Sequence, residues 1–362
     1  MRFYDSMQMD PAGLKKMIRN SDDPKVKRRL FSAMALRSVL LVLFSMAVIS
    51  PASAIFGAEN SCMAVSLLCI LLGIRFVDLG YRISDSMVNL AIVFTLLLVA
   101  PPAATLVHPA LGTVIHISAF FVILFMTSQH PEMGNAGLYT FAYIFLSGNP
   151  VTGDAFRNRA LLTAVGYAVC GGILFAKHRG KNRGIRFSDL VKDFCLSDSK
   201  VLWQLQLALG VGLILGIGSR FNLDRAMWAA FACGSILGCY NATADGVRER
   251  LRNRMAGTLI GTLAFFLAYQ VVPAGLHSLF GIAGGLIVGF CADYRSKTAC
   301  NCLGALFIAS SIFGLHETLW LRVLHNLLGI IFGYVFWMIF QEITCTVQDL
   351  RPGVWAQDAE NA

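Results

Sequence analysis

The sequence predicts an all-α, polytopic membrane protein with about 12 transmembrane helices, arranged as two tandem six-helix repeats. Three observations predict this fold class: the composition, the spacing of the apolar runs, and a basic segment that divides them six and six. Of the 362 residues, 56% are hydrophobic and only 14% are charged. A typical soluble domain carries about 25% charged residues, so this chain is too apolar for one aqueous core. A bilayer suits it, because about 20 apolar residues cross the hydrocarbon as a helix.

The apolar runs define the expected spans. Several are shorter than the usual ~17–25 residues, and these we expect to be re-entrant, tilted or extended by their flanks. Pro101-Pro102 is predicted to break the third span near its end, because proline cannot donate a helical hydrogen bond. The expected spans are 34–56, 60–75, 87–107, 110–128, 135–150, 159–176, 201–219, 225–241, 255–273, 275–291, 298–314 and 321–341.

The distribution of Lys and Arg predicts the orientation of the chain. With the N-terminus inside, the inner segments carry 24 basic residues and the outer loops carry five. This asymmetry follows the positive-inside rule for membrane proteins. It also accounts for the net charge of +9 without a nucleic-acid partner, because the basic residues lie between apolar spans. We therefore expect a multi-pass protein of the bacterial inner membrane with both termini cytoplasmic.

The first 33 residues form a polar leader with its own helix signals. Asp10-Pro11 and Asp23-Pro24 each read as an N-cap followed by proline at the first helical position. They predict a short amphipathic surface helix, then a second helix that runs from Pro24 into the first span. Residues 51–54 resemble a signal-peptide cleavage site, but a long acidic leader favours an uncleaved anchor.

The basic segment suggests an internal repeat. In the first half, Arg159 precedes the last span and Gly166 follows seven residues later; in the second half, Arg322 and Gly329 keep the same interval. An even number of helices in each half gives a parallel repeat about the membrane normal. The expected divisions are a leader at 1–33, a first transmembrane repeat at 34–176, a linker at 177–200, a second repeat at 201–342 and a cytoplasmic tail at 343–362.

Small residues in the second half predict close helix packing. Glycines four residues apart line one helix face and let backbones approach each other. We assign them to packing and not to substrate binding: Gly257, Gly261, Gly281, Gly285, Gly289, Gly329 and Gly333.

The cysteine pattern predicts neither disulfides nor a metal centre. The chain has ten cysteines, mostly in apolar runs or basic segments. Cys300 and Cys302 are two residues apart, so their thiols point to different sides of a helix. We predict no metal, no cofactor and no catalytic group.

The most informative stretch lies between Arg225 and Gly261. Arg225 and Trp228 stand at the outer mouth of a span, an arginine-rich elbow follows, and Arg254 begins the pattern R-x-x-G-T-x-x-G. The elbow arginines occupy alternate positions, and of these Arg250 and Arg254 share a helix face.

This stretch resembles the fusaric acid resistance, or aromatic acid exporter, superfamily of integral membrane transporters. The plant aluminium-activated malate transporters look like distant relatives. The resemblance implies export of aromatic or other organic acids, sometimes with a periplasmic adaptor subunit as partner. The corresponding segment of the first half, 81–91, keeps an arginine but lacks the Gly-Thr pair and the later glycine.

An anion that crosses a membrane needs compensating positive charge, and arginine can bind a carboxylate through two hydrogen bonds. The candidate pathway residues are Arg37, Arg159, Arg225, Trp228, Arg254 and Arg322. The alternative is that these arginines reach the headgroups or pair locally, as Asp224 and Glu317 allow. Tryptophans such as Trp203 and Trp228 are first expected in the interfacial belt.

Three classes of function remain. The first is an exporter or facilitator of small organic anions, whose substrate, direction and energy coupling stay open. The second is a membrane enzyme acting on lipids, which the absence of convergent catalytic groups disfavours. The third is a non-transporting scaffold for envelope assembly. The sequence contains no phosphate-binding loop, so we do not expect it to hydrolyse ATP. Whether the chain forms a homo-oligomer is left open.

Overall fold

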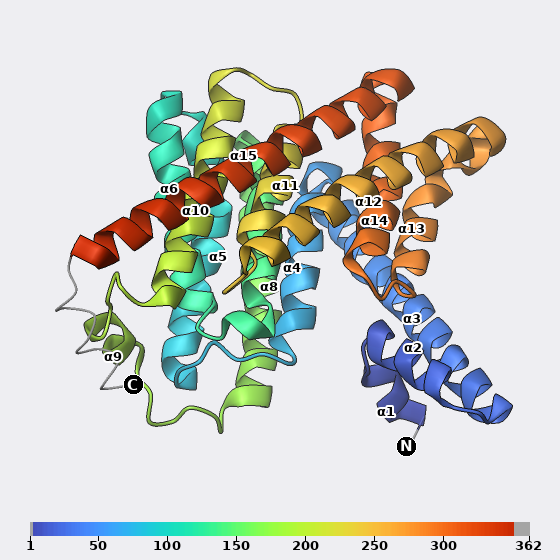
Figure 1. The fold of residues 1–362 in the computed structure, drawn as a ribbon, viewed down its shortest axis with the longest axis horizontal. Coiled ribbons are helices and arrows are strands. Elements are labelled where there is room, and N and C mark those ends of the chain that lie inside the picture. The colour runs from blue at the N-terminus through green and yellow to red at the C-terminus, as the bar shows by residue number, and fades with distance from the viewer. Residues whose placement is uncertain (1–2, 351–362) are drawn as a thin grey trace. The chain divides into compact units, whose positions relative to one another are not determined.

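The computed structural model describes residues 3–350, and these residues are almost entirely helical, with no strand among them (Figure 1). The α-helices are α1 (Phe3–Gln8), α2 (Pro11–Asn20), α3 (Pro24–Phe56), α4 (Ser61–Ile74), α5 (Ile83–Thr105), α6 (Pro109–Thr127), α7 (Asn135–Ser147), α8 (Gly153–His178), α9 (Phe187–Lys192), α10 (Ser199–Arg220), α11 (Met227–Leu237), α12 (Ala244–Val271), α13 (Phe280–Val288), α14 (Tyr294–Phe313) and α15 (Leu315–Leu350). Short 3-10 turns at Ala58–Asn60, Pro131–Met133 and Ala274–Leu279 precede α4, α7 and α13.

Each of the 12 expected spans falls on one of these helices, which confirms the polytopic α-helical fold class. Within the described residues, seven helices are long and apolar enough to cross a membrane by length and composition: α3, α5, α6, α8, α10, α14 and α15. Shorter apolar helices lie at Ala58–Ile74, Met227–Leu237 and Ala274–Val288.

The helix starts follow the predicted capping signals. Asp10 accepts a hydrogen bond from the backbone N–H of Gly13 at 3.2 Å, and α2 begins at Pro11. Asp23 accepts one from the N–H of Lys25 at 2.8 Å, and α3 runs from Pro24 through the first span. The predicted break at Pro101-Pro102 is wrong, because α5 continues to Thr105. Each proline removes its own N–H bond to the carbonyl four residues earlier, but its fixed φ of about −65° is compatible with a helix, so the helix can continue.

The contacts divide the chain into two compact units, each described here by itself. Unit 1 comprises Met1–Val48 and Arg248–Leu327, and unit 2 comprises Ile49–Val247 and Leu328–Ala362. These bounds differ from the repeat halves, because compact units follow contacts and a repeat follows sequence. The repeat domains therefore stay a prediction, and residues 351–362 of the expected tail lie outside the described part of the chain.

Unit 2 contains a bundle of α4 to α8 joined by α10 and α11 (Figure 1). Helices α6 and α10 run side by side, and two glycines of α10 permit their approach. A methyl group at Gly212 or Gly216 would collide with Ile117 or Thr113 of α6. Close backbone approach of this kind is how helices associate in a bilayer, where hydrophobic driving force between helices is absent.

Unit 1 contains a similar glycine-mediated contact between two helices. The first half of α3 packs on α13, where Ser38 donates a hydrogen bond to the carbonyl of Leu286 at 2.6 Å. Gly289 leaves room for Ser38, and Gly285 leaves room for Val42. The opening helix of each sequence half thus packs on a helix of the other half: α3 on α13, and α10 on α6.

A second correspondence concerns the last helix of each half. In α8, a methyl group at Gly166 would lie 2.5 Å from side-chain carbons of Leu67 on α4. In α15, a methyl group at Gly329 would meet Ala229 and Ala232 on α11, the helix that matches α4 in the expected repeat.

Candidate functional site

The motif R-x-x-G-T-x-x-G lies on α12, which is one continuous helix from the arginine-rich elbow into the span. A methyl group at Gly257 would lie 2.6 Å from the carbonyl oxygen of Arg295, and one at Gly261 would collide with the carbonyl of Ala299. Both glycines therefore hold α12 against the backbone of α14. The packing assignment fits the other predicted glycines except Gly281, beside which a methyl group would meet nothing within 4 Å.

Asn326 of α15 organises the polar side chains that accompany these glycines. Its side-chain oxygen accepts hydrogen bonds from Nε of Arg254 at 3.2 Å and from the hydroxyl of Thr258 at 3.4 Å. Its side-chain nitrogen donates to the carbonyl of Arg322 at 2.9 Å. Both ends of a buried amide are thus satisfied, which fixes the direction of the Arg254 side chain.

Tyr294, the first residue of α14, joins two arginines of α12. Arg254 donates from Nη1 to the tyrosine hydroxyl at 3.2 Å, while the guanidinium of Arg250 lies 3.3 Å above the ring centroid. This confirms that Arg250 and Arg254 share a helix face. A guanidinium over an aromatic face is attracted by the ring quadrupole, so the tyrosine holds a second positive charge beside Arg254.

Further buried polar groups continue this site along α14 and α15. Arg322 donates from Nη2 to the thiol of Cys302 at 3.7 Å, and His325 is buried one helical turn beyond it. We call the set the α12–α15 polar cluster; its members are Arg250, Arg254, Thr258, Tyr294, Cys302, Arg322, His325 and Asn326. Placing an ionisable side chain within a membrane span costs free energy, so such residues suggest a functional site.

The charge of the cluster is positive. The structure shows no salt bridge to Arg254 within residues 3–350; its partners are the neutral oxygens of Asn326 and Tyr294. Asp293 caps α14 beside Tyr294, but its carboxylate binds the N–H and hydroxyl of Ser296. Those hydrogen bonds hold the pKa of Asp293 below its ordinary value.

Arg159 of α8 has a different environment in unit 2. Its side chain is 1% exposed and donates to the Asn60 side chain at 2.8 Å, to the carbonyl of Asn149 at 2.8 Å and to that of Glu59 at 2.9 Å. A fourth contact joins Nη2 to the Cys62 thiol at 3.2 Å. This guanidinium therefore ties α8 to the start of α4 and to the end of α7.

The remaining candidates are described within their own units. In unit 1, Arg37 of α3 donates to the carbonyl of Met9 in the leader at 2.5 Å. In unit 2, Arg225 lies in the turn before α11 with a left-handed backbone (φ 55°), and its carbonyl accepts from the N–H of Trp228. Trp228 and Trp203 are both buried in the unit 2 bundle, while their predicted place in the interfacial belt stays a prediction.

Among the predicted pathway residues, Asn326 links the Arg254 side chain to the backbone carbonyl of Arg322, and the carbonyl of Arg225 accepts from the N–H of Trp228. Asn326 and His325 lie within the expected span 321–341, but the sequence analysis did not predict a role for Tyr294. Tyr294 lies 40 residues from Arg254, and no local spacing links them. Across residues 3–350, no group of three or more side chains is arranged to hold a metal ion.

These features define a multi-pass α-helical membrane protein with a positively charged polar cluster built by three helices. Residues 209–340, a little over a third of the chain, match the family described as fusaric acid resistance protein-like. The matched region is similar to this family of membrane transporters and contains Arg225, Arg254, Tyr294 and Asn326, so the resemblance inferred from the motif is confirmed.

Neither the curated proteins nor the solved structures yield a match. The similarity to plant aluminium-activated malate transporters stays a prediction.

Proposed function

We propose that the protein carries small organic anions across the membrane and that the α12–α15 polar cluster binds the anion. The observation that carries this proposal is the state of Arg254. Its side chain is half-buried and is oriented by two neutral oxygens, with no carboxylate bound to it in residues 3–350. Arginine keeps its charge in proteins, so an entering anion supplies the countercharge.

The chemistry of the cluster suits a carboxylate. A guanidinium offers donors in a planar fork that matches the two oxygens of a carboxylate. The orientation of Arg254 is already fixed by Asn326 and Tyr294, so little side-chain entropy is lost on binding. Arg250 adds a second positive charge on the same tyrosine, which strengthens attraction of an anion in a medium of low dielectric constant.

The finer identity of the substrate rests on the family. A family described by resistance to an organic acid supports export of an organic, aromatic acid from the cytoplasm across a bacterial inner membrane. We also retain a periplasmic adaptor subunit as a partner, and a homo-oligomer, as proposals. The competing proposal, a non-transporting scaffold, predicts no solute-dependent effect when the gene is deleted.

The test compares two arginines of one helix. Arg254→Gln removes a cluster charge, whereas Arg252→Gln removes an exposed charge from a different face of α12. Cells with and without the gene are loaded with a panel of weak aromatic and aliphatic acids, and their efflux is followed. We expect Arg254→Gln to lower efflux about tenfold, the loss of one charge-assisted hydrogen bond, and Arg252→Gln to leave it unchanged.

The amount of each variant in the membrane is measured in parallel. Equal efflux by both variants at equal protein levels would remove the cluster from the transport pathway. No efflux of any acid by the unmodified protein would favour the scaffold.

A further inference from the structure

Two cysteines of unit 1 lie in direct contact beside the α12–α15 polar cluster. The sulfur of Cys291, just after α13, lies 3.6 Å from the sulfur of Cys300 in the second turn of α14. Among the cysteines whose side chains the structure describes, these are the two whose sulfurs touch, and both are free thiols. A disulfide bond is about 2.0 Å long, so a short movement would join the two atoms.

The packing of α13 on α14 holds the two thiols together. A methyl group at Gly284 of α13 would lie 3.1 Å from the carbonyl oxygen of Cys300, so the two helices approach each other closely. The Cys291 thiol also donates a hydrogen bond to the carbonyl of Ile287 at 3.4 Å, which directs its sulfur. Because both side chains are already ordered, little conformational entropy opposes a bond between them.

The thiols of this region differ in their access to solvent. Cys300 is partly exposed, whereas Cys291 is 6% exposed. Cys302 lies on another side of α14, as its spacing from Cys300 predicts: it is fully buried, and its thiol donates to the carbonyl of Thr298 at 3.4 Å. Oxidation of cysteines depends on exposure, so a small oxidant in solution reaches Cys300 before the other two.

We infer that Cys291 and Cys300 form a redox-sensitive site, which a peroxide converts to a disulfide. With hydrogen peroxide, the sulfur of Cys300 attacks one oxygen, the O–O bond breaks, water leaves and Cys300 becomes a sulfenic acid. The sulfur of Cys291 then attacks the sulfur of Cys300, the S–O bond breaks, and a second water leaves with the thiol proton. Two thiols thus lose two electrons and two protons, and one peroxide is reduced to two waters.

The disulfide acts on the polar cluster through Tyr294. This tyrosine begins α14 between the two cysteines, and its hydroxyl accepts a hydrogen bond from Arg254. A cross-link closes the short loop 291–300 and restricts how far the tyrosine can move with Arg254 of α12. In the expected orientation this loop faces the cytoplasm, where cellular reductants keep thiols reduced until an oxidant appears. Formation of the disulfide is independent of the proposed function, whereas its effect on transport rests on it.

The experiment treats the purified full-length protein in detergent with hydrogen peroxide, blocks the remaining thiols and digests the protein with trypsin without reductant. Arg295 and Lys297 lie between the two cysteines, so trypsin releases them on separate peptides that only a disulfide keeps joined. We expect mass spectrometry to find these peptides linked after peroxide treatment and separate after reduction.

Variants of the pair test the order of the two steps. Cys300→Ser should abolish the linked peptides. Cys291→Ser should leave Cys300 as a sulfenic acid, which dimedone labels more strongly than in the unmodified protein because the second thiol is gone. Linked peptides that persist in Cys300→Ser, or that are absent from the unmodified protein, overturn the inference.

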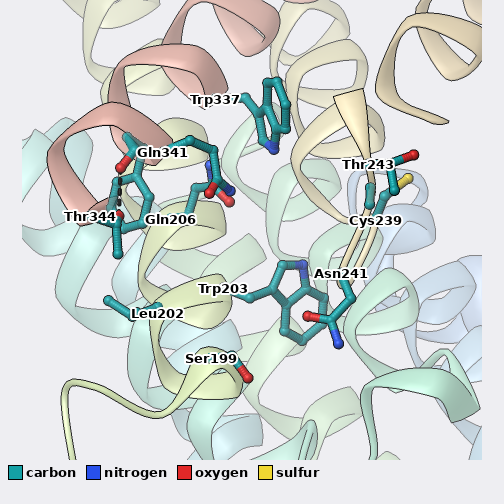
Figure 2. A pocket seen from close by; sticks show the side chains of 12 residues that line it. Ser199, Leu202, Trp203, Gln206, Cys239, Asn241, Thr243, Trp337, Gln341 and Thr344 are labelled. Carbon is teal, nitrogen blue, oxygen red and sulfur yellow. Dashed lines mark hydrogen bonds between the residues drawn. The ribbon is translucent and has the colours of Figure 1, made fainter. Parts of the chain in front are cut away.

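Two further cysteines supply matched controls. Cys302→Ala removes the thiol that shares a tryptic peptide with Cys300. Cys239→Ser removes a partly exposed thiol of unit 2, which Figure 2 shows among the side chains that line a cavity of about 490 Å³. Both variants should keep the link between Cys291 and Cys300, and the melting temperature of each variant shows whether it is folded.

The effect on transport is measured in cells. A brief exposure to peroxide should lower efflux of an aromatic acid several-fold with the unmodified protein but not with Cys291→Ser, and dithiothreitol should restore it. Unaltered efflux despite linked peptides supports the disulfide and rejects its control of the polar cluster. Unaltered efflux by Arg254→Gln rejects the polar cluster alone, because the link is detected without transport.

Discussion

Arg159 in unit 2 and Arg254 in unit 1 are both arginines on membrane helices, and they have opposite surroundings. Arg159 is fully buried and contacts four acceptors of the protein. Arg254 is half-buried and is held by two neutral oxygens. A guanidinium with four contacts to the protein anchors helices, whereas one that is oriented but not neutralised can receive an anion.

The largest effect is expected when the anchor is removed. Arg159→Met leaves the Asn60 side chain and two carbonyls without their donor inside the bundle. We expect a loss of stability on the order of 3 kcal/mol, because each unpaired buried acceptor costs about 1–3 kcal/mol. Thermal unfolding of the purified protein measures this loss.

A matched control is available two residues earlier on the same helix. Arg157 is exposed and lies 3.4 Å from Asp154, so Arg157→Met should leave the melting temperature nearly unchanged. A variant Arg159→Met that is stable but inactive in efflux would contradict the comparison and return Arg159 to the pathway.

A smaller effect is expected at Arg225, which we place between the helix-anchoring Arg159 and the anion-binding Arg254. Its family motif suggests a pathway role, and its backbone lies in the left-handed region. We expect Arg225→Ala to lower efflux of an aromatic carboxylate several-fold at an unchanged amount of protein in the membrane. Arg225→Gly should behave alike in efflux while relieving the backbone conformation, because glycine adopts positive φ without steric cost.

Unaltered efflux in both Arg225 variants would remove this residue from the pathway. Reduced efflux in the alanine variant alone, together with less folded protein, would show that the effect is structural.

The smallest effect is expected at the contact between Asp78 and the linker, which, unlike the contacts of Arg159, depends on ionisation. Asp78 accepts hydrogen bonds from Gly80, from Lys181 at 3.3 Å and from Asn182 at 2.8 Å, the last two in the linker. Burial opposes ionisation of this carboxyl, but these bonds outweigh it and hold its pKa below the ordinary 3.8. A lowered pKa stabilises the docked linker above pH 3.8, and this contribution is lost as the pH falls through the folded-state pKa.

Hydrogen exchange of the linker amides, corrected for intrinsic exchange rates, should show easier opening as the pH falls below this value. Asp78→Asn should open more easily at neutral pH and show little further change in acid. An identical acid response in both proteins would assign the effect to other groups.

The sequence predicted local features well because their causes are local. Apolar runs of sufficient length became helices, Asp10 and Asp23 capped the helices they precede, and the spacing of Arg250 and Arg254 placed both on one face. Pro101-Pro102 misled because proline weakens a helix without always ending it: its fixed φ is compatible with helical backbone.

The features that were missed are long-range. Tyr294 and Arg254 meet across two helices, a contact that no local periodicity reveals. Trp203 was expected in an interfacial belt because an aromatic near a span end carries the same pattern whether lipid or protein surrounds it. Likewise, no sequence motif predicts that α3 packs on α13 or that α10 packs on α6.

The first helix of each sequence half packs on a helix of the other half, and this arrangement constrains how the protein is synthesised and inserted. Ser38 leaves the ribosome 248 residues before its hydrogen-bond partner Leu286, so α3 enters the bilayer long before the surface that receives it exists. Lipid or the insertion machinery must cover the face of α3 that carries Ser38 and Val42 during that interval. A chain cut within the linker would give two fragments that each lack a helix supplied by the other, and they should accumulate only when produced together.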